Sequence, residues 1–330
     1  MKNNDIRYLR TEDTKALSDY FSLKERIKNN VYDNDTLSND DKTAYIEYIE
    51  NLFLEFNFKL QRTQSNSIFN TLVIPITNVC NLNCKGCDVY APLCNGRNRS
   101  DYPKDRLCAD IDQLYKLGFS IIEVSIEGGE PFLNTELYDI VSNLRKISDY
   151  HSHELIISIL TNGLLLDKVS DTDFLSIKDN DAILIIDKYV EIPNFSNVLS
   201  KLDKMGIKYD LDGCIHDDGW FHRAPLDLTN YATKEQSANH TIQCEKGNSI
   251  ITMDHGLLYK CGRCASIKHF NSFFKKELPD IGIDIYAHTK KEIADFLTAP
   301  NPLCKYCLPF DEEGKPWCRS SRDISEWANI

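Results

Sequence analysis

Apolar runs and helical apolar spacing alternate along the chain from Phe69 to about Leu211. The short apolar runs predict strands, and apolar residues recurring every three to four positions predict helices between them. Apolar strands that alternate with helices indicate a parallel sheet covered by helices, either doubly wound or a barrel. In both, the ligand site lies at the C-terminal ends of the strands. The predicted strands are 71–76, 121–126, 155–160, 182–186 and 207–211, and the helices are 104–117, the segment around 137–147, and 196–205.

The segment 1–67 contains no cysteine and has a helical pattern. Ser38 and Asp41 have the spacing of a capping box. Apolar residues then follow at helical spacing: Tyr45, Tyr48, Ile49, Leu52, Phe53 and Phe56. We expect an N-terminal helical cap here. The alternative, a peptide-recognition module, is weakened because the alternation typical of strands is missing.

The strand–helix alternation fades beyond about Asp217. The remaining chain contains six of the twelve cysteines, several turns marked by Gly or Pro, and one clear helix opened by Thr289 and Glu292. A segment too rich in loops to build a large core commonly depends on a metal. We therefore expect a second, metal-dependent unit at 231–330.

Composition and charge exclude several classes of function. The chain is 42% hydrophobic, but no uncharged apolar run reaches the length of a membrane span, and the first residues are polar. These features favour a cytoplasmic protein over a membrane or secreted one. The formal charge of −12 argues against a nucleic-acid partner, which would require clustered basic side chains. In a protein expected to be cytoplasmic, clustered thiols indicate metal or redox sites rather than disulfides.

Three cysteines, Cys80, Cys84 and Cys87, follow the first predicted strand within eight residues. Zinc and iron–sulfur clusters both bind cysteine thiolates. A closed zinc site needs four ligands, and the next cysteine, Cys94, is seven residues away. A cluster with three protein ligands leaves one iron open, as a catalytic metal requires. The spacing favours a cluster over zinc, and both remain open.

The spacing C-x3-C-x2-C resembles the signature of the radical S-adenosylmethionine (radical SAM) superfamily. Two further motifs follow later strands as they do in that family: Gly128–Pro131 resembles its GGEP motif, and Thr161–Gly163 follows the third strand. The resemblance implies a partial (β/α)6 TIM-like barrel at 68–230, with the helical cap at 1–67 and a small cysteine-rich α+β domain at 231–330.

The resemblance also implies cofactors and their ligands. Cys80, Cys84 and Cys87 would hold a [4Fe–4S] cluster whose open iron binds S-adenosylmethionine (SAM). Reductive cleavage of SAM would give a 5′-deoxyadenosyl radical that removes a hydrogen atom from the substrate, with a reductant such as flavodoxin or ferredoxin. Gly86 departs from the family, which usually has an aromatic residue there. The implied SAM contacts are Gly128, Gly129 and Glu130 for the amino group, and Asn162 and Asp187 for the ribose or carboxylate.

The cysteine-rich tail resembles the Twitch domain, a shortened relative of the SPASM domain. That resemblance implies one auxiliary [4Fe–4S] cluster. The competing interpretation is a structural zinc site that pairs Cys261-x2-Cys264 with Cys304-x2-Cys307. Cys264 and Cys318 are spare in the cluster interpretation. The implied cluster ligands are Cys244, Cys261, Cys304 and Cys307.

Polar and aromatic residues late in the barrel are candidates for contact with the substrate. Cys214 is the distinct one, because its S–H can return a hydrogen atom to a substrate radical; an inert buried thiol is the alternative. We expect a small polar substrate of carbohydrate or amino-sugar type, undergoing oxidation or epimerisation. The alternatives are maturation of a ribosomally made peptide, and a non-catalytic iron–sulfur or zinc sensor or scaffold. The other candidates are Lys188, Tyr189, Asp212, His216, Asp217, Trp220, His222 and Arg223.

Overall fold

The computed structural model describes residues 68–94, 99–211, 220–221, 225–229, 244, 250–308 and 315–330, together with 31, 37–38 and 42–45. The chain divides into two compact units, residues 1–65 with 152–154, and residues 66–151 with 155–330. Most of the predicted helical cap lies outside the described residues, including Asp41 of the capping box. Residues 42–45 are helical, and the Lys42 N–H donates to the Ser38 carbonyl at 2.9 Å.

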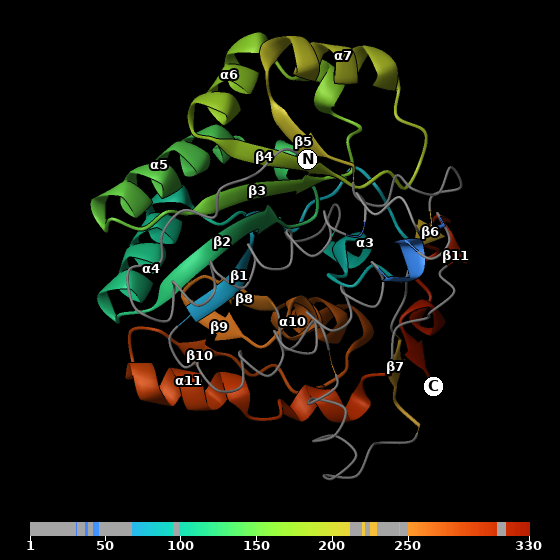
Figure 1. Ribbon diagram of the computed structural model, residues 1–330. Coiled ribbons are helices and arrows are strands. Elements are labelled where there is room, and N and C mark those ends of the chain that lie inside the picture. Colours follow the sequence, from blue (N-terminus) through green and yellow to red (C-terminus); the bar gives the residue numbers. More distant parts are fainter. Residues whose placement is uncertain are drawn as a thin grey trace. The chain divides into compact units, whose positions relative to one another are not determined.

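The second unit is built around one open sheet, which has eight strands in the described part of the chain. Six neighbouring strands are parallel, in the order β8-β1-β2-β3-β4-β5, where β8 is Ile250–Asp254. Strands β9 (Leu257–Tyr259) and β10 (Ile283–Asp284) extend the β8 edge in antiparallel fashion. The fold is therefore mixed α/β with a parallel central sheet that does not close (Figure 1). The first five strands are β1 (Ile68–Pro75), β2 (Ser120–Glu127), β3 (Ile156–Thr161), β4 (Ala182–Ile186) and β5 (Lys208–Asp210).

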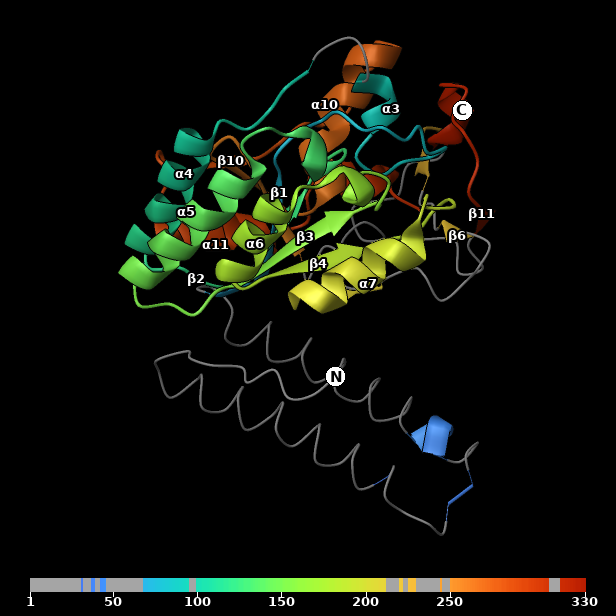
Figure 2. The same cartoon turned by 90° about the horizontal axis from the view of Figure 1, so that it is seen from above.

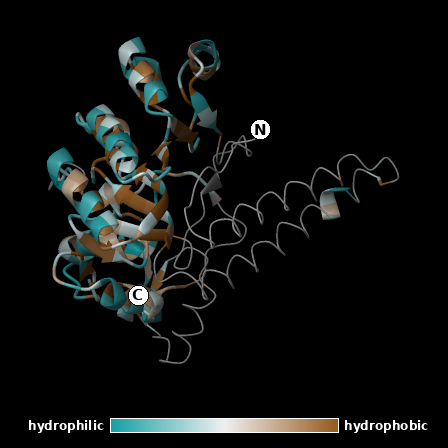
Figure 3. Cartoon of the chain, turned by 60° about the vertical axis from the view of Figure 1, so that its left-hand side comes forward, coloured by the Kyte–Doolittle hydropathy of each residue, from teal (hydrophilic) through white to brown (hydrophobic). Residues whose placement is uncertain are grey.

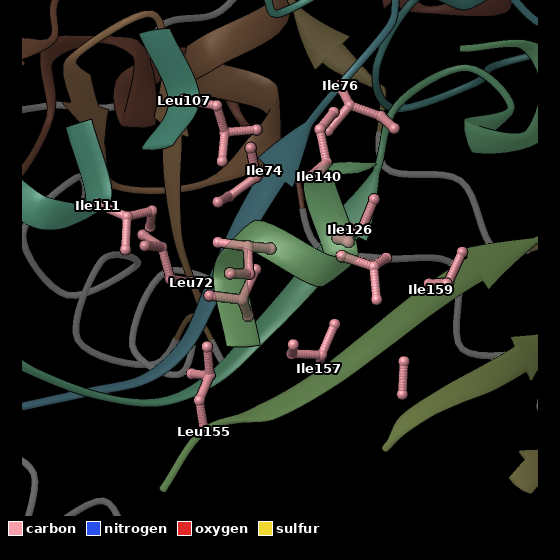
Figure 4. Close-up of a cluster of buried hydrophobic side chains, with 14 of the residues drawn as sticks. Leu72, Ile74, Ile76, Leu107, Ile111, Ile126, Ile140, Leu155, Ile157 and Ile159 are labelled. Atoms are coloured by element: carbon pink, nitrogen blue, oxygen red, sulfur yellow. The ribbon is translucent and has the colours of Figure 1, made fainter. Parts of the chain in front are cut away.

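Helices α4, α5, α6 and α7 line one side of these strands (Figures 1 and 2). Side chains alternate between the two faces of a strand, so every second residue of β1, β2 and β3 meets the helices. Figure 4 shows this core, in which Leu72, Ile74 and Ile126 are fully buried. The strands are accordingly mostly hydrophobic while the helices are mixed (Figure 3). The helices are α4 (Lys104–Lys116), α5 (Leu137–Tyr150), α6 (Asp171–Asp179) and α7 (Phe195–Met205).

The predicted strands and helices of this segment are confirmed with small shifts at their ends, except that α6 was not predicted. Its start carries a signal, since Ser170 Oγ accepts a hydrogen bond from Asp173 N at 3.1 Å as an N-cap. The apolar spacing that would have completed the prediction is thin, because only Phe174 and Ile177 of α6 are buried.

The sheet continues into the cysteine-rich segment. Strand β8 (Ile250–Asp254) pairs in parallel with β1 and forms a tight hairpin with β9 (Leu257–Tyr259). His255 and Gly256 form the two-residue turn and both have positive φ, the requirement of a type I′ turn. The turn directs the chain back along β9 toward Cys261, which follows that strand by two residues. The boundary predicted at 230/231 remains a prediction.

Two α-helices lie in the described part of the cysteine-rich segment, where the pattern predicted one. Helix α11 (Lys290–Thr298) begins at the predicted capping box, because Thr289 Oγ1 accepts from Glu292 N and Thr289 N donates to Glu292 Oε2. The unpredicted helix α10 (Gly262–Phe274) lacks a clear apolar stripe because it is buried on several sides. It packs with short α3 (Ala91–Cys94) in a second apolar cluster that includes Tyr90 and Trp327.

The remaining elements are short. They are β6 (Trp220–Phe221) paired with β11 (Lys315–Pro316), β7 (Leu226–Asp227) paired with β12 (Ala328–Asn329), β10 (Ile283–Asp284), and the 3-10 helices η1 (Pro131–Leu133), η2 (Leu166–Lys168), η3 (Pro302–Tyr306) and η4 (Ile324–Glu326). Among the helices that the structure describes, none has the length and apolar character needed to cross a membrane.

Candidate functional site

The loops that follow β1 and β2 lie directly against each other. Gly129 N donates to the Thr77 carbonyl, and Glu130 N donates to the Val79 carbonyl, both at 2.8 Å. A Cβ atom added to Gly129 would lie 2.1 Å from the Val79 oxygen, and one added to Gly128 would lie 2.3 Å from the Thr77 oxygen. The two glycines therefore allow the GGEP backbone to run against the start of the cysteine loop.

Glu130 joins the ends of β2 and β3 from a fully buried position. Its carboxylate accepts hydrogen bonds from Thr161 Oγ1 at 2.8 Å, Asn162 N at 3.0 Å and Phe132 N at 3.3 Å. Burial raises the pKa of the Glu130 carboxyl, and these donors oppose the shift. The side chain thus holds the third motif against the second; its implied contact with the SAM amino group stays a prediction.

Asn162 brings the third motif to the cysteine loop. Its Nδ2 donates to Asn81 Oδ1 at 2.8 Å and lies 3.8 Å from Cys80 Sγ. Its Oδ1 accepts from Leu164 N at 3.1 Å, which fixes the amide. Asn162 therefore borders the cysteine loop, a position compatible with its implied role beside a nucleotide.

Asp187 lies at the end of β4, where its N–H donates to the Thr161 carbonyl at 2.9 Å. The Tyr189 hydroxyl donates to the Asp187 carboxylate. Burial is the main cause that raises the pKa of the Tyr189 phenol, followed by the charge of Asp187 and then by those of Cys84 and Cys87. Asp187 and Tyr189 therefore lie near the cysteines, and the implied contact of Asp187 with a ribose or carboxylate stays a prediction.

The thiols of Cys80, Cys84 and Cys87 lie close together and largely out of solvent. Burial raises the pKa of Cys84 to about 12 and that of Cys87 to about 11, and the charges of Cys84 and Cys87 add to a rise at Cys80. Two of the sulfurs also receive N–H donors, Leu82 N at 3.4 Å from Cys80 Sγ and Trp317 Nε1 at 3.2 Å from Cys84 Sγ. Backbone N–H groups that follow Cys87 oppose the rise in the pKa of its thiol.

Hydrogen bonds to sulfur are one of the ways in which proteins tune iron–sulfur clusters. Within the described residues, no three His, Cys, Asp or Glu side chains surround a position suited to a single metal ion. A cubane binds each thiolate through a different iron atom and does not require such convergence. Three neighbouring thiols with N–H donors therefore fit a cluster with an open iron.

The tail cysteines form a second group. Cys261 Sγ and Cys264 Sγ lie 3.5 Å apart, and this contact lowers the pKa of the Cys261 thiol to about 6. Burial lowers the pKa of Lys260, while charges on nearby cysteines raise it: Cys304, Cys264, Cys244 and Cys261. The structure thus gathers three of the four implied ligands near Lys260 and adds Cys264, which the cluster interpretation left spare.

Arg263 links the two groups of cysteines. Its side chain is only 9% exposed, with Nη1 3.4 Å from Cys307 Sγ and Nη2 3.2 Å from Asp88 Oδ1. Asp88 follows Cys87 directly, so one guanidinium connects the first cysteine loop to the tail. The sequence carries no signal for this contact, because Arg263 and Asp88 are far apart along the chain.

The face of the sheet opposite the helices is polar along β2. Glu123 accepts from Ser158 Oγ at 2.5 Å and Thr71 Oγ1 at 3.2 Å, and Ser125 Oγ donates to Glu127 Oε1 at 3.0 Å. None of these residues was among the predicted site residues. The sequence does carry a signal for them, because polar residues occupy alternate positions of β2. A parallel strand that is covered on both faces is normally apolar throughout.

Six of the predicted substrate-facing residues lie outside the described residues: Asp212, Cys214, His216, Asp217, His222 and Arg223. Trp220 is described only as part of β6. Lys188 Nζ lies 3.4 Å from Glu191 Oε2, and its ammonium lies 5.9 Å from the centre of the Phe195 ring. Between residues 230 and 249 the structure describes Cys244 alone. Cys318 is exposed. The hydrogen-donor role of Cys214 therefore stays a prediction.

Comparison with known proteins gives a consistent result for the barrel segment. Residues 74–190 match the Radical SAM superfamily. A probable GTP 3′,8-cyclase of Methanococcus aeolicus is 34% identical over 105 residues, which are 31% of this chain and 32% of that protein. The GTP 3′,8-cyclase of Alkaliphilus oremlandii is 31% identical over 107 residues, 31% of this chain and 30% of that protein. The chain thus spans about a third of the length of these curated relatives.

Among solved structures, BtrN in complex with AdoMet and 2-DOIA matches with a TM-score of 0.45 and 15% identity, covering 73% of this chain and 93% of BtrN. Native anSMEcpe with bound AdoMet matches with a TM-score of 0.44 and 15% identity, covering 72% of this chain and 82% of anSMEcpe. SuiB of Streptococcus suis matches with a TM-score of 0.34 and 14% identity, covering 78% of this chain and 58% of SuiB.

Proposed function

We propose that this chain, in which residues 74–190 form a radical SAM domain, is an enzyme that cleaves SAM reductively and abstracts a hydrogen atom from a small polar substrate. The observation that carries the proposal is the contact among three motifs that are far apart in sequence. The GGEP backbone runs against the cysteine loop, and the Glu130 carboxylate binds Thr161 and Asn162 of the third motif. A sensor or scaffold has no need for this arrangement.

Each part of the site has a role in the proposed reaction. When bound, the cluster of Cys80, Cys84 and Cys87 supplies the electron that cleaves SAM into methionine and the 5′-deoxyadenosyl radical. The protein holds the three thiols largely out of water, which protects a reactive radical from side reactions. The amide of Asn162 and the carboxylate of Asp187 border the same loop, where they can orient a nucleotide and its amino-acid part.

The substrate part of the proposal is a carbohydrate or amino sugar that is oxidised or epimerised. The row formed by Glu123, Ser125 and Glu127 supports a polar substrate, because carboxylates and hydroxyls on one sheet face can bind hydroxyl and ammonium groups. Flavodoxin or ferredoxin is the proposed electron donor. Maturation of a ribosomally made peptide is the alternative within the same chemistry.

A second candidate is a rearrangement of a purine nucleotide, as the names of the curated relatives suggest. Their identity of 31–34% covers the radical SAM segment, in which the cluster and SAM are bound, and about a third of either chain. The matched part therefore supports the shared cleavage of SAM more strongly than a shared substrate. GTP belongs in the first set of compounds to be tested.

The tail is proposed to hold a second metal centre. The ligands would come from five cysteines, since Cys264 lies 3.5 Å from Cys261, with Cys304, Cys307 and Cys244 as the others. One auxiliary [4Fe–4S] cluster is the proposed occupant, and structural zinc on Cys261, Cys264, Cys304 and Cys307 is the competing one. Counting iron, sulfide and zinc in protein purified without oxygen separates the two.

The decisive experiment is anaerobic reconstitution with iron and sulfide, followed by incubation with SAM and dithionite. We expect release of 5′-deoxyadenosine by the native chain and none by Cys80→Ala. Cys108→Ala is the matched control, because Cys108 lies on α4 and belongs to neither cysteine group. Intact SAM together with bound zinc would support a scaffold, and cleavage by Cys80→Ala would refute the assigned cysteine loop.

Transfer of deuterium identifies the substrate class. Deuterated amino sugars, GTP and model peptides are each incubated with the reconstituted enzyme and SAM. The compound that transfers deuterium into 5′-deoxyadenosine carries the abstracted hydrogen. Transfer from GTP alone would replace the carbohydrate proposal with the nucleotide one.

A further inference from the structure

A segment near residue 320 is paired with the loop that contains Cys84. Lys85 N donates to the Cys318 carbonyl at 3.0 Å, and Ser320 N donates to the Asn83 carbonyl at 2.8 Å. These two hydrogen bonds form an antiparallel bridge between Cys84 and Arg319. We call residues 317–320 the strap. The strap lies far C-terminal of the barrel segment in sequence, and its backbone is hydrogen-bonded to the central part of the cysteine loop.

The strap also places a side-chain donor on one of the cysteine sulfurs. Trp317 Nε1 lies 3.2 Å from Cys84 Sγ, within the range of an N–H···S hydrogen bond. Cys84 is 8% exposed, so this hydrogen bond is shielded from most of the solvent. A hydrogen bond in such surroundings is electrostatically stronger than one in water.

The strap is itself held in place by a buried carboxylate. Glu326, which is 7% exposed, accepts hydrogen bonds from the Ser320 hydroxyl and from both N and Oγ of Ser321, the latter two at 2.7 Å. The strap therefore has anchors on two sides, the cysteine loop and Glu326. This leaves the Trp317 indole in a defined position against Cys84.

Trp327 provides an internal comparison. Its Nε1 donates to the Cys87 carbonyl at 2.9 Å, so it contacts the same loop through the backbone. Both tryptophans tie the C-terminal part of the chain to the cysteine loop. They differ in the acceptor, which is a ligand sulfur for Trp317 and a peptide oxygen for Trp327.

We propose that Trp317 is a positioning residue that tunes the cluster held by Cys84, raising its reduction potential through the N–H···S hydrogen bond. A donor on a ligand sulfur withdraws electron density from it and stabilises the reduced, more negative state of the cluster. The inference rests on the proposed cluster at Cys80, Cys84 and Cys87. Neither the family match nor the three sequence motifs include Trp317.

The test is a redox titration of the reconstituted full-length protein, followed by electron paramagnetic resonance. The barrel cluster is identified as the signal that changes when SAM is added. Native protein is compared with Trp317→Phe, with Trp327→Phe, and with a chain in which 3-benzothienylalanine replaces Trp317. The last substitution keeps the shape of the ring and removes only the N–H.

We expect Trp317→Phe and the benzothienyl variant to shift the barrel cluster to a more negative potential, so that its reduced fraction at a fixed potential falls severalfold. Trp327→Phe is expected to leave that fraction unchanged. Should Trp317→Phe fail to hold iron, the benzothienyl variant decides, because it preserves packing. An unchanged potential in a benzothienyl variant that holds the cluster overturns the inference. Absence of a SAM-responsive cluster in the native protein refutes the proposed function instead.

Discussion

The Thr161 hydroxyl donates a 2.8 Å hydrogen bond to the Glu130 carboxylate and thereby joins the ends of two neighbouring parallel strands. Both side chains are buried, and Glu130 also accepts from Asn162 N. The motif whose implied ligand is SAM therefore also joins two strands of the sheet at the site.

Replacing Glu130 should destabilise the fold even without a cofactor. Glu130→Ala leaves the Thr161 hydroxyl and the Asn162 N–H buried without their acceptor, at a cost of about 1–3 kcal/mol for each group. Glu130→Gln keeps one acceptor oxygen and should cost less. Urea denaturation of the metal-free protein measures both. Glu191→Ala, at a side chain that is 85% exposed, should change the free energy of unfolding by less than about 0.5 kcal/mol. Equal stability of Glu130→Ala and native protein would contradict this role.

Gly129→Ala should displace the cysteine loop. The new Cβ would lie 2.1 Å from the Val79 oxygen, and that neighbour is backbone, which cannot rotate away as a side chain does. Overpacking of this kind costs about 1–3 kcal/mol or more. We expect a lower melting temperature and loss of iron from the barrel site after reconstitution. Gly262→Ala is the matched control, because its Cβ would meet its nearest neighbour at an ordinary 3.9 Å. Full iron content in Gly129→Ala would show that the two loops need not touch.

Arg263→Met should weaken the connection between the first cysteine loop and the tail. The substitution keeps much of the side-chain length but removes the donors to Cys307 Sγ and Asp88. Removal of one partner from a buried ion pair costs about 3–5 kcal/mol, and the lower figure applies here because Asp88 keeps 27% side-chain exposure. Arg99→Met removes an exposed pair with Asp101 and should cost about 1 kcal/mol or less. The comparison is made by urea denaturation; similar losses in both variants would argue against a special role for Arg263.

Stability should fall at mildly acidic pH because of His269. Burial lowers the pKa of His269 from 6.5 to about 4, assisted by the charge of Lys268 and opposed by that of Asp254. The unfolded chain therefore binds a proton that the folded chain does not, so this contribution is present above pH 6.5 and is lost as pH falls toward 4. The loss at pH 4 is on the order of 2–3 kcal/mol.

His269→Gln should reduce this acid sensitivity. Melting curves between pH 7 and pH 4 compare it with native protein and with His288→Gln, which removes an imidazole from an exposed position. A pH dependence in His269→Gln as steep as in the native protein would assign the effect to other groups.

Most of the barrel part of the fold was predictable because its strands and all its long helices except α6 carry a clear apolar pattern. A helix was expected over 104–117, and its apolar residues Leu107, Ile111 and Leu114 are all fully buried in α4. Strand β4 has the predicted ends. Helix α10 was missed because residues on most of its sides are buried, including Arg263 and Cys264, which erases the amphipathic pattern that identifies a surface helix.

The three motifs of the candidate site could be placed at strand ends from sequence, but their mutual contacts could not. The hydrogen bonds of Glu130, Arg263 and Trp317 join residues separated by 31, 175 and 233 positions. Such contacts depend on how the sheet and the tail fold together, and the local pattern of apolar and polar residues does not predict them. The polar row on β2 was visible in the sequence, where Glu123, Ser125 and Glu127 alternate with buried residues.

The antiparallel bridge from Cys84 to Arg319 has a consequence for biogenesis. A ribosome that has completed the cysteine loop must add more than two hundred further residues before Trp317 can reach it. During that interval the loop lacks both the backbone bridge to Arg319 and the N–H donor of Trp317. The outer side of the cysteine loop can therefore be completed only after the C-terminal residues have been synthesised.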